Sequence, residues 1–227
     1  MVTVVVFEFS VMRCQPLRRA LGFINQMRSF ILFIAPKISS QDWNDLDLDN
    51  KESDWLIAVD ILEARLFGRY ISPVDLLIDS EAELNPSDKK FGFTTLAIDF
   101  LLMETFQAFK DGEINSERKS RKLFTKFLKE SPTFSCYFKT NGQRKKFYTE
   151  FRCGILHQAE VQSSALVWSV GDLYEREQGK HKVNRIYVHR ALKEEIGKYL
   201  EQLRDPSSTE LRLAFRNKMN AIVARGD

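Results

Sequence analysis

The chain has 227 residues, of which 44% are hydrophobic and 29% charged, and this is the composition of an ordinary soluble globular protein. Its length suits one domain with a core of its own, or a domain with a small appended subdomain. The net charge of +3 does not indicate any class of binding partner. The apolar runs near the start are interrupted by arginines before they reach the roughly 18 residues that a membrane span requires. We therefore expect no membrane partner and no cleaved signal peptide.

Cysteine usage indicates the redox compartment. The three cysteines, Cys14, Cys136 and Cys153, are odd in number and far apart, and none lies in a CxxC pair or a Cys/His cluster with zinc spacing. This pattern favours a reducing cytoplasm over a disulfide-bonded or zinc-binding domain. We expect a cytoplasmic protein with no metal site and no cofactor.

The first half of the chain predicts two long helices. An acidic loop at 42–54 precedes a segment, 53–70, whose apolar residues have mostly helical spacing. Pro73 is expected to interrupt this helix before a further short apolar element. The most hydrophobic stretch, 91–112, ends at Gly112, a good helix stop. It predicts a buried central helix.

The second half continues with helices and one expected hairpin. A basic helix is predicted at about 116–130, stopped by Pro132, and another helix begins near 143. A polar stretch with Gly171 and Gly179 separates the apolar segments 164–170 and 183–189, and this pattern predicts a small β-hairpin near 164–188. Two amphipathic helices, 190–204 and 208–225, close the chain.

These elements predict an all-α helical bundle with a small β-hairpin insertion. We expect residues 51–227 to form this domain, and residues 1–50 to be an N-terminal extension that contains the acidic loop. The strand-like residues 2–10, VTVVVFEFS, fit no helix of the bundle.

Positive charge is concentrated between residues 118 and 152. Eleven Lys and Arg face only Glu130 and Glu150 there, a local net charge of +9. Such a block can bind a phosphate backbone, although it also fits a solvated helix face. The predicted RNA-binding residues within it are Arg118, Lys119, Arg121, Lys122, Arg144, Lys145 and Lys146.

A candidate catalytic pair lies in FYTEFRCGILHQAEV, residues 147–161. Arg152 can bind phosphate oxygens and keeps its charge, and His157 can move a proton near neutral pH. On a straight α-helix, residues five apart point about 140° away from each other. The two can therefore cooperate only if Gly154 loosens the helix locally or a second copy completes the site. A purely structural role for both remains the alternative.

Neighbouring residues offer further hypotheses. Cys153 and His157 share a helix face at i and i+4, but a Cys–His nucleophile would need an oxyanion hole that a mid-helix backbone does not supply. Asp99 and Glu104, inside the apolar 91–112 helix, are expected to support the site, one of them by pairing with Arg152. The alternative is that one or both face solvent at the edge of the bundle.

The chain also contains two histidines outside this segment. Arg176 and His181 repeat the Arg-x4-His spacing in a polar stretch that we expect to be a loop without function. His189, just before an amphipathic helix, is expected to be a surface or capping residue.

At FRCGILHQAE, residues 151–160, the sequence resembles the HEPN superfamily, whose ribonuclease members carry Arg, four to six residues, then His in a helix. More of the chain is similar to a group of uncharacterised bacterial HEPN-like proteins. The likeness spans roughly 55–223 and is carried by residues 96–109, 124–134, 147–160, 184–192 and 211–222.

The resemblance implies a four-helix bundle that forms a homodimer, so that two Arg/His motifs line one cleft. It implies metal-independent endoribonuclease activity that leaves a cyclic phosphate, often in toxin–antitoxin or phage-defence settings, with an antitoxin or another protein as a further partner. Family ribonucleases usually have a polar residue directly after the Arg, and Cys153 stands there in this chain. Two alternatives stay open: a non-catalytic helical module that binds nucleotide, RNA or a protein, and a purely structural helical dimer.

Overall fold

The computed structural model describes residues 32–162 and 164–225. These residues belong to one compact unit, although a boundary was expected after residue 50. Trp43 and Leu48, both before that boundary, are buried in its core. The strand-like residues 2–10 and Cys14 lie outside the described residues.

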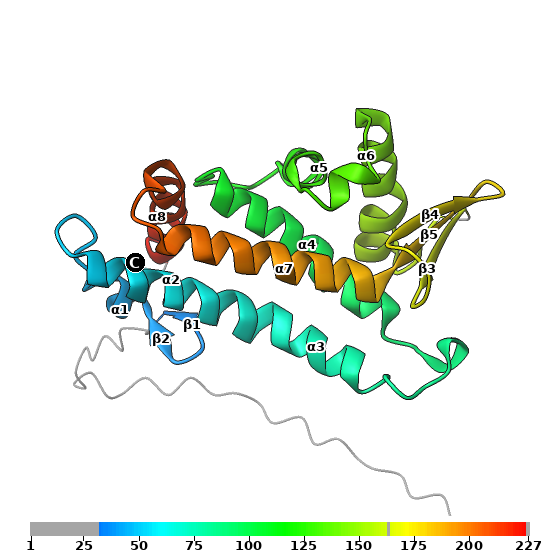
Figure 1. Cartoon of the computed structure of the whole chain (residues 1–227), viewed down its shortest axis with the longest axis horizontal. Coiled ribbons are helices and arrows are strands. Elements are labelled where there is room, and N and C mark those ends of the chain that lie inside the picture. The colour runs from blue at the N-terminus through cyan, green and yellow to red at the C-terminus, as the bar shows by residue number, and fades with distance from the viewer. Residues whose placement is uncertain (1–31, 163, 226–227) are drawn as a thin grey trace, which may run out of the picture. The chain divides into compact units, whose positions relative to one another are not determined.

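Helices make up most of the described chain (Figure 1). Two helices, α2 (Glu52–Leu66) and α3 (Ser72–Asp79), lie roughly in line, and α7 (Arg185–Arg204) packs beside α2. The central helix α4 (Gly92–Lys110) contacts α5 (Ser120–Glu130), α7 and α8 (Thr209–Val223). Short elements complete the helical part: α1 (Ser40–Asn44), α6 (Asn141–Phe147) and the 3-10 turns η2 (Pro86–Asp88) and η3 (Phe134–Cys136).

The central helix α4 agrees with the sequence prediction. Its apolar side chains are buried on several sides, with Phe100 and Phe106 almost fully covered. It ends before Gly112, which has φ +62° and lies against α8, where a Cβ atom would be 2.9 Å from the Cα of Ala214. Only glycine satisfies both the left-handed backbone and this close approach.

Pro73 does not end the helix that begins at Glu52. A π-helical turn, η1 (Phe67–Ile71), follows α2 and leads directly into α3. Pro73 then occupies the first turn of α3, where its missing N–H and fixed φ are tolerated best. The expected interruption is therefore absorbed by a change of helix type.

Two small sheets accompany the helices. Strands β1 (Phe33–Ala35) and β2 (Ile38–Ser39) form an antiparallel pair. A hairpin forms within the expected region 164–188, but its arms are β4 (Tyr174–Glu177) and β5 (Lys180–Asn184), with positive φ at both turn residues, Gln178 and Gly179. The expected arms were 164–170 and 183–189. Strand β3 (Ala165–Trp168) adds to β5 in parallel. The protein is thus mostly helical with small sheets, rather than purely all-α.

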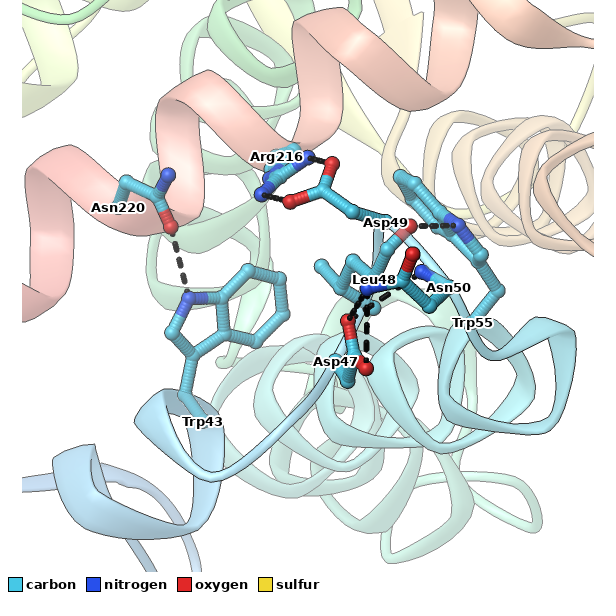
Figure 2. Close-up of polar contacts among 8 residues, drawn as sticks. All are labelled: Trp43, Asp47, Leu48, Asp49, Asn50, Trp55, Arg216 and Asn220. Carbon is cyan, nitrogen blue, oxygen red and sulfur yellow. Dashed lines mark hydrogen bonds and ion pairs between the residues drawn. The ribbon is translucent and has the colours of Figure 1, made fainter.

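The acidic loop is fastened to α8 (Figure 2). Trp43 packs edge-on against Phe215 with ring centroids 5.6 Å apart, and its Nε1 donates to Asn220 Oδ1 at 2.8 Å. The Arg216 guanidinium donates to both carboxylate oxygens of Asp49, at 2.6 and 2.8 Å. Two acids of this region, Asp49 and Glu52, are therefore paired with arginines of α8 within the fold.

Removing the amide that holds Trp43 should destabilise the fold. For Asn220→Ala we expect a loss of about 1–2 kcal/mol in the free energy of unfolding, because the largely buried indole N–H loses its acceptor. Arg216→Gln is the matched control on the same helix, and its exposed ion pair should contribute little. Urea unfolding measures both; equal effects of the two variants would contradict this ranking.

None of the helices in the described residues combines the length and the hydropathy that crossing a bilayer requires.

Candidate functional site

The segment that carries Arg152 and His157 begins as an α-helix and continues as a π-helix. A capping box starts α6: Gln143 N donates to Thr140 Oγ1 at 3.2 Å, and Thr140 N donates to Gln143 Oε1 at 2.8 Å. From Tyr148 the helix widens into η4 (Tyr148–Gln158). Phe147, Phe151 and Ile155 are buried along one side of it, so the apolar stripe fixes which side chains face outward.

The π-helix brings Arg152 and His157 together. Its hydrogen bonds run from residue i to i+5, so residues five apart lie above one another instead of on opposite flanks. Arg152 Nη1 is 3.1 Å from His157 Nε2. A guanidinium has no acceptor, so a hydrogen bond here requires Nε2 to accept, and the imidazole in this arrangement is neutral.

Gly154 makes this geometry sterically feasible. Its carbonyl accepts from Ala159 N, the i+5 bond of the π-helix, and from Glu160 N at 3.3 Å. The chain then turns back over Gly154 through Ala159, which has φ +54°. A Cβ atom on Gly154 would be only 2.4 Å from the Glu160 carbonyl oxygen. The sequence prediction that Gly154 would be needed for cooperation thus has a structural counterpart.

We expect Gly154→Ala to disturb the site rather than to be silent. The added methyl group must displace the backbone of Glu160, which should cost about 1–3 kcal/mol of stability and separate His157 from Arg152. Thermal unfolding and the cleavage assay described below measure the two effects. Gly142→Ala is the matched control, since a Cβ there meets only Thr140 Oγ1, at 3.8 Å. Equal stability and equal cleavage by the two variants would contradict the role of Gly154 in shaping the site.

Glu104 on α4 holds the Arg152 side chain. Its Oε1 accepts from Arg152 Nε at 2.7 Å and its Oε2 from Nη2 at 3.2 Å. Ser120 Oγ donates to the same Oε1 at 2.9 Å and lies 2.9 Å from the Tyr148 hydroxyl. Burial lowers the pKa of Arg152, but the bond to Glu104 and its charge raise it overall. The guanidinium is therefore fixed with its Nη1 edge directed to His157.

A small cavity adjoins this pair. It has a volume of about 130 Å³, and its lining includes Glu104, Arg152, Ser116 and Lys218 of α8. Lys218 is buried and donates to the Glu113 carbonyl at 2.8 Å. Burial lowers the pKa of its ammonium, and the nearby Arg225 lowers it further. The cavity therefore has two cations and one carboxylate in its wall, while His157 lies outside it at the surface.

The other supporting residues lie in different surroundings. Cys153 is partly exposed beside Tyr148, and burial raises the pKa of that phenol, with a smaller contribution from Cys153. Asp99 does not pair with Arg152. It is fully buried and accepts from His189 Nδ1 at 2.8 Å, while His189 Nε2 is 3.2 Å from Asp75 Oδ1.

The prediction that His189 is a surface or capping residue is wrong, because only 3% of it is exposed. A buried carboxylate on α4 needs a compensating partner, and His189 on α7 supplies it. Lys193 extends the network with a 2.7 Å contact to Asp75. Two acids in the otherwise apolar sequence of α4 indicated that buried polar partners exist. The sequence alone could not say which residues these partners are.

The predicted RNA-binding residues fall into two groups. Lys119 pairs with Glu113, Lys146 approaches Glu150 at 3.5 Å, and Arg144 donates to the carbonyls of Phe138 and Lys139. Within the part of the chain that the structure describes, the remaining four are exposed and have no ion-pair partner: Arg118, Arg121, Lys122 and Lys145.

The second Arg-x4-His match is built differently. Arg176 and His181 are cross-strand neighbours in the β4–β5 hairpin rather than loop residues. Arg176 is exposed, whereas His181 is buried and its Nδ1 contacts the Tyr174 hydroxyl. Within the described residues, the same spacing gives no Arg–His hydrogen bond in this strand pair, which makes Arg176 a useful control position.

Among residues 32–162 and 164–225, no group of three or more His, Cys, Asp and Glu side chains is placed to hold a metal ion. Comparisons of the chain with protein-family models, with curated proteins and with solved structures find no match.

Proposed function

We propose that this protein is a metal-independent endoribonuclease of HEPN type, in which Arg152 and His157 act on the same phosphate. The observation that carries the proposal is the 3.1 Å contact between Arg152 Nη1 and His157 Nε2 across one turn of π-helix. π-Helical turns of this kind occur frequently at functional sites. The likeness of residues 151–160 to the HEPN ribonuclease motif agrees with this reading.

The chemistry requires a base, an acid and a positive charge at the phosphate. His157 takes the proton of a ribose 2′-hydroxyl, whose oxygen attacks the adjacent phosphorus, and the bond from phosphorus to the 5′-oxygen breaks. That oxygen leaves with a proton from an imidazolium. Arg152 offsets the charge that grows on the phosphorane oxygens. The products are a 2′,3′-cyclic phosphate and a 5′-hydroxyl.

The fixed orientation of Arg152 suits this role. Glu104 occupies its Nε and Nη2 atoms, so that Nη1 is the edge available to a phosphate next to His157. A guanidinium already held in one orientation loses little freedom when the transition state forms. Glu104 is a positioning residue in this mechanism, and Ser120 orients Glu104.

A homodimer would supply the second imidazole. One His157 faces Arg152 in each copy, whereas simultaneous removal and donation of a proton requires two groups. The exposed position of His157 would allow the same residue of a second copy to approach the scissile bond. An antitoxin or another protein partner that covers this face would block access to RNA.

A non-catalytic RNA-binding or nucleotide-binding module is the second candidate. The cavity beside Glu104 contains Arg152 and Lys218 but not His157, so a phosphate could be bound there without being cleaved. Cys153, in the position that is polar in the family ribonucleases, also favours this alternative, because a thiol is a weak hydrogen-bond donor.

The two candidates differ in turnover. The purified protein is incubated in EDTA with a mixed-sequence RNA and, separately, with DNA of the same sequence. The ribonuclease proposal predicts that RNA is cut and DNA is bound but left intact, because DNA lacks the 2′-hydroxyl. Binding of both strands with neither cut would favour the non-catalytic module.

The exposed cations should contribute to RNA affinity through phosphates. For Arg121→Gln combined with Lys122→Gln, we expect weaker binding and a salt-dependence slope of log affinity that is smaller by about 2. Lys180→Gln combined with Lys182→Gln, on the β5 strand, is a control of equal charge change. Fluorescence anisotropy at several salt concentrations measures how the RNA affinity depends on salt. The same salt dependence in both double variants would contradict a role for Arg121 and Lys122 in RNA binding.

A further inference from the structure

A second cavity lies at the beginning of α4, twelve residues and thus about 18 Å along the helix from Glu104. Its volume is about 230 Å³. The turn at η2, the first turn of α4, the end of β3 and the first turn of α7 meet there. Its polar and aromatic lining consists of Ser87, Lys89, Gly92, Trp168, Ser169 and Arg185.

The first turn of α4 is uncapped. Its N-cap residue is Phe91, whose side chain cannot accept a hydrogen bond. The backbone N–H groups of Gly92, Phe93 and Thr94 have no acceptor among the described residues. Gly92 lies so close to β3 that a Cβ atom would be 2.9 Å from Val167 Cγ1. The long helix α4 therefore begins at the cavity, where Gly92 is part of the lining, and its first turn has free N–H groups and the positive end of the helix dipole.

Arg185 adds an independent signal. Its side chain is only 3% exposed, and Nη2 is bound to Glu81. Nη1 is buried and has no hydrogen-bond partner among the described residues. An unpaired nitrogen on a buried guanidinium is costly, and Arg185 is one of the residues that line the cavity.

Glu81 does not use up the positive charge of this region. Its Oε1 accepts from Lys90 N at 2.6 Å and from Phe91 N at 3.1 Å, and its Oε2 accepts from Arg185. This one carboxylate thus offsets the charge of Arg185 and binds the backbone directly before α4. The balance at the cavity stays positive, and the Ser87 and Ser169 hydroxyls provide further donors.

Trp168 indicates which chemical group accompanies an anion bound in this cavity. It forms the rim of the cavity at the end of β3, and 46% of it is exposed. An exposed indole beside a phosphate-binding pocket is suited to stacking on a base, because every base has a π-face. We propose that this cavity binds a nucleoside carrying a terminal phosphate, with the phosphate at Arg185, Lys89 and the first turn of α4 and the base on Trp168.

Indole fluorescence gives a test that does not depend on cleavage. The full chain is titrated with a nucleoside monophosphate, with the nucleoside and with inorganic phosphate. We expect saturable quenching by the monophosphate, at least about tenfold weaker binding of the nucleoside, and loss of the signal in Trp168→Phe. No saturable binding at millimolar concentrations, or equal binding of monophosphate and nucleoside, would overturn the proposal.

Variants at the rim distinguish this site from general charge attraction. Lys89→Gln and Ser87→Asp should each weaken binding about tenfold, because one removes a cation and the other places a carboxylate where the phosphate belongs. Lys90→Gln is the control: Lys90 lies over the Phe91 ring and does not line the cavity. Equal loss in Lys89→Gln and Lys90→Gln would overturn the assignment.

The terminal phosphate could belong to a free nucleotide or to the 5′ end of an RNA. An RNA oligonucleotide is therefore compared with and without its 5′ phosphate, in wild type and in Ser87→Asp. A preference for the 5′-phosphorylated RNA that Ser87→Asp removes identifies an RNA end. Quenching by the mononucleotide without such a preference identifies a free nucleotide. Either result supports the site.

Discussion

Replacing His157 with alanine is expected to reduce RNA cleavage by about 10²–10⁴-fold, the usual contribution of a general acid or base. The His157 side chain is exposed, and its contact in the described residues is with Arg152. Its removal should therefore leave the fold intact. Single-turnover cleavage of an end-labelled RNA in EDTA measures the rate.

Two controls make the His157 result specific. The thermal unfolding of His157→Ala should match that of wild type, and its RNA affinity should change by less than its cleavage rate, since Arg152 and Glu104 remain in place. A cleavage rate within a few-fold of wild type, at unchanged stability, would contradict the assignment of His157 as the proton-transferring residue.

The buried network around His189 should produce the largest effect on stability. His189→Ala removes the partner of Asp99, a carboxylate with no exposure to solvent. Breaking a buried pair in this way is expected to cost about 3–5 kcal/mol in the free energy of unfolding. Urea unfolding monitored by circular dichroism measures the loss.

The same network predicts a pH dependence. Burial lowers the pKa of His189, but its hydrogen bonds and charge interactions with Asp99 and Asp75 raise it overall. A histidine with a raised pKa in the folded state stabilises the protein fully below its unfolded pKa of about 6.5, and the contribution is lost as the pH rises through the folded value. Wild-type stability should therefore decline over this range, and the decline should be smaller in His189→Gln.

A double variant tests whether the pair is the cause. Asp99→Asn combined with His189→Gln removes both charges and leaves groups that can hydrogen-bond to each other. It should be more stable than His189→Ala and should lack the pH dependence of wild type. If the double variant is as unstable as His189→Ala, and its stability still declines with rising pH as in wild type, another titrating group must be responsible.

The long helices could be predicted from the sequence because their apolar residues repeat with helical spacing. The 91–112 stretch and its stop at Gly112 correspond to α4, and the last two amphipathic segments correspond to α7 and α8. A hairpin near 164–188 was predicted from two apolar segments around a glycine-containing polar stretch, and the first of these segments forms β3. The parallel pairing of β3 with β5 and the role of β4 as a hairpin arm were not predicted, since strand pairing depends on tertiary contacts.

The central feature of the candidate site was only partly predictable. Residues 147, 151 and 155 are buried at spacings of four, a pattern that fits an α-helix, so the sequence contained no direct sign of a π-helix. On a straight α-helix, Arg152 and His157 would point about 140° apart and could not act together. A local loosening of the helix at Gly154 was one of the two expected solutions, and a second copy was the other. In the structure, residues 159–161 pack back over Gly154, and this packing accompanies the i to i+5 hydrogen bonds. The sequence does not show it.

Long-range pairings set the other limit. One of Asp99 and Glu104 was expected to pair with Arg152, and Glu104 is the one that does, whereas Asp99 and His189 were not assigned to each other. Likewise, the acidic loop looked like part of an extension, because its partners Arg216 and Asn220 lie more than 160 residues away. Charge complementarity between distant segments cannot be assigned from one sequence without knowledge of the fold.

The most direct test of the account is the mass of the RNA fragments produced in EDTA by wild type, Arg152→Ala and Arg176→Ala. Arg176 is the matched control, because it has the same spacing to a histidine but lies exposed in a hairpin. We expect 2′,3′-cyclic phosphate ends from wild type and Arg176→Ala, and intact RNA with Arg152→Ala. Intact RNA with wild type, or equal cleavage by all three folded proteins, would contradict it.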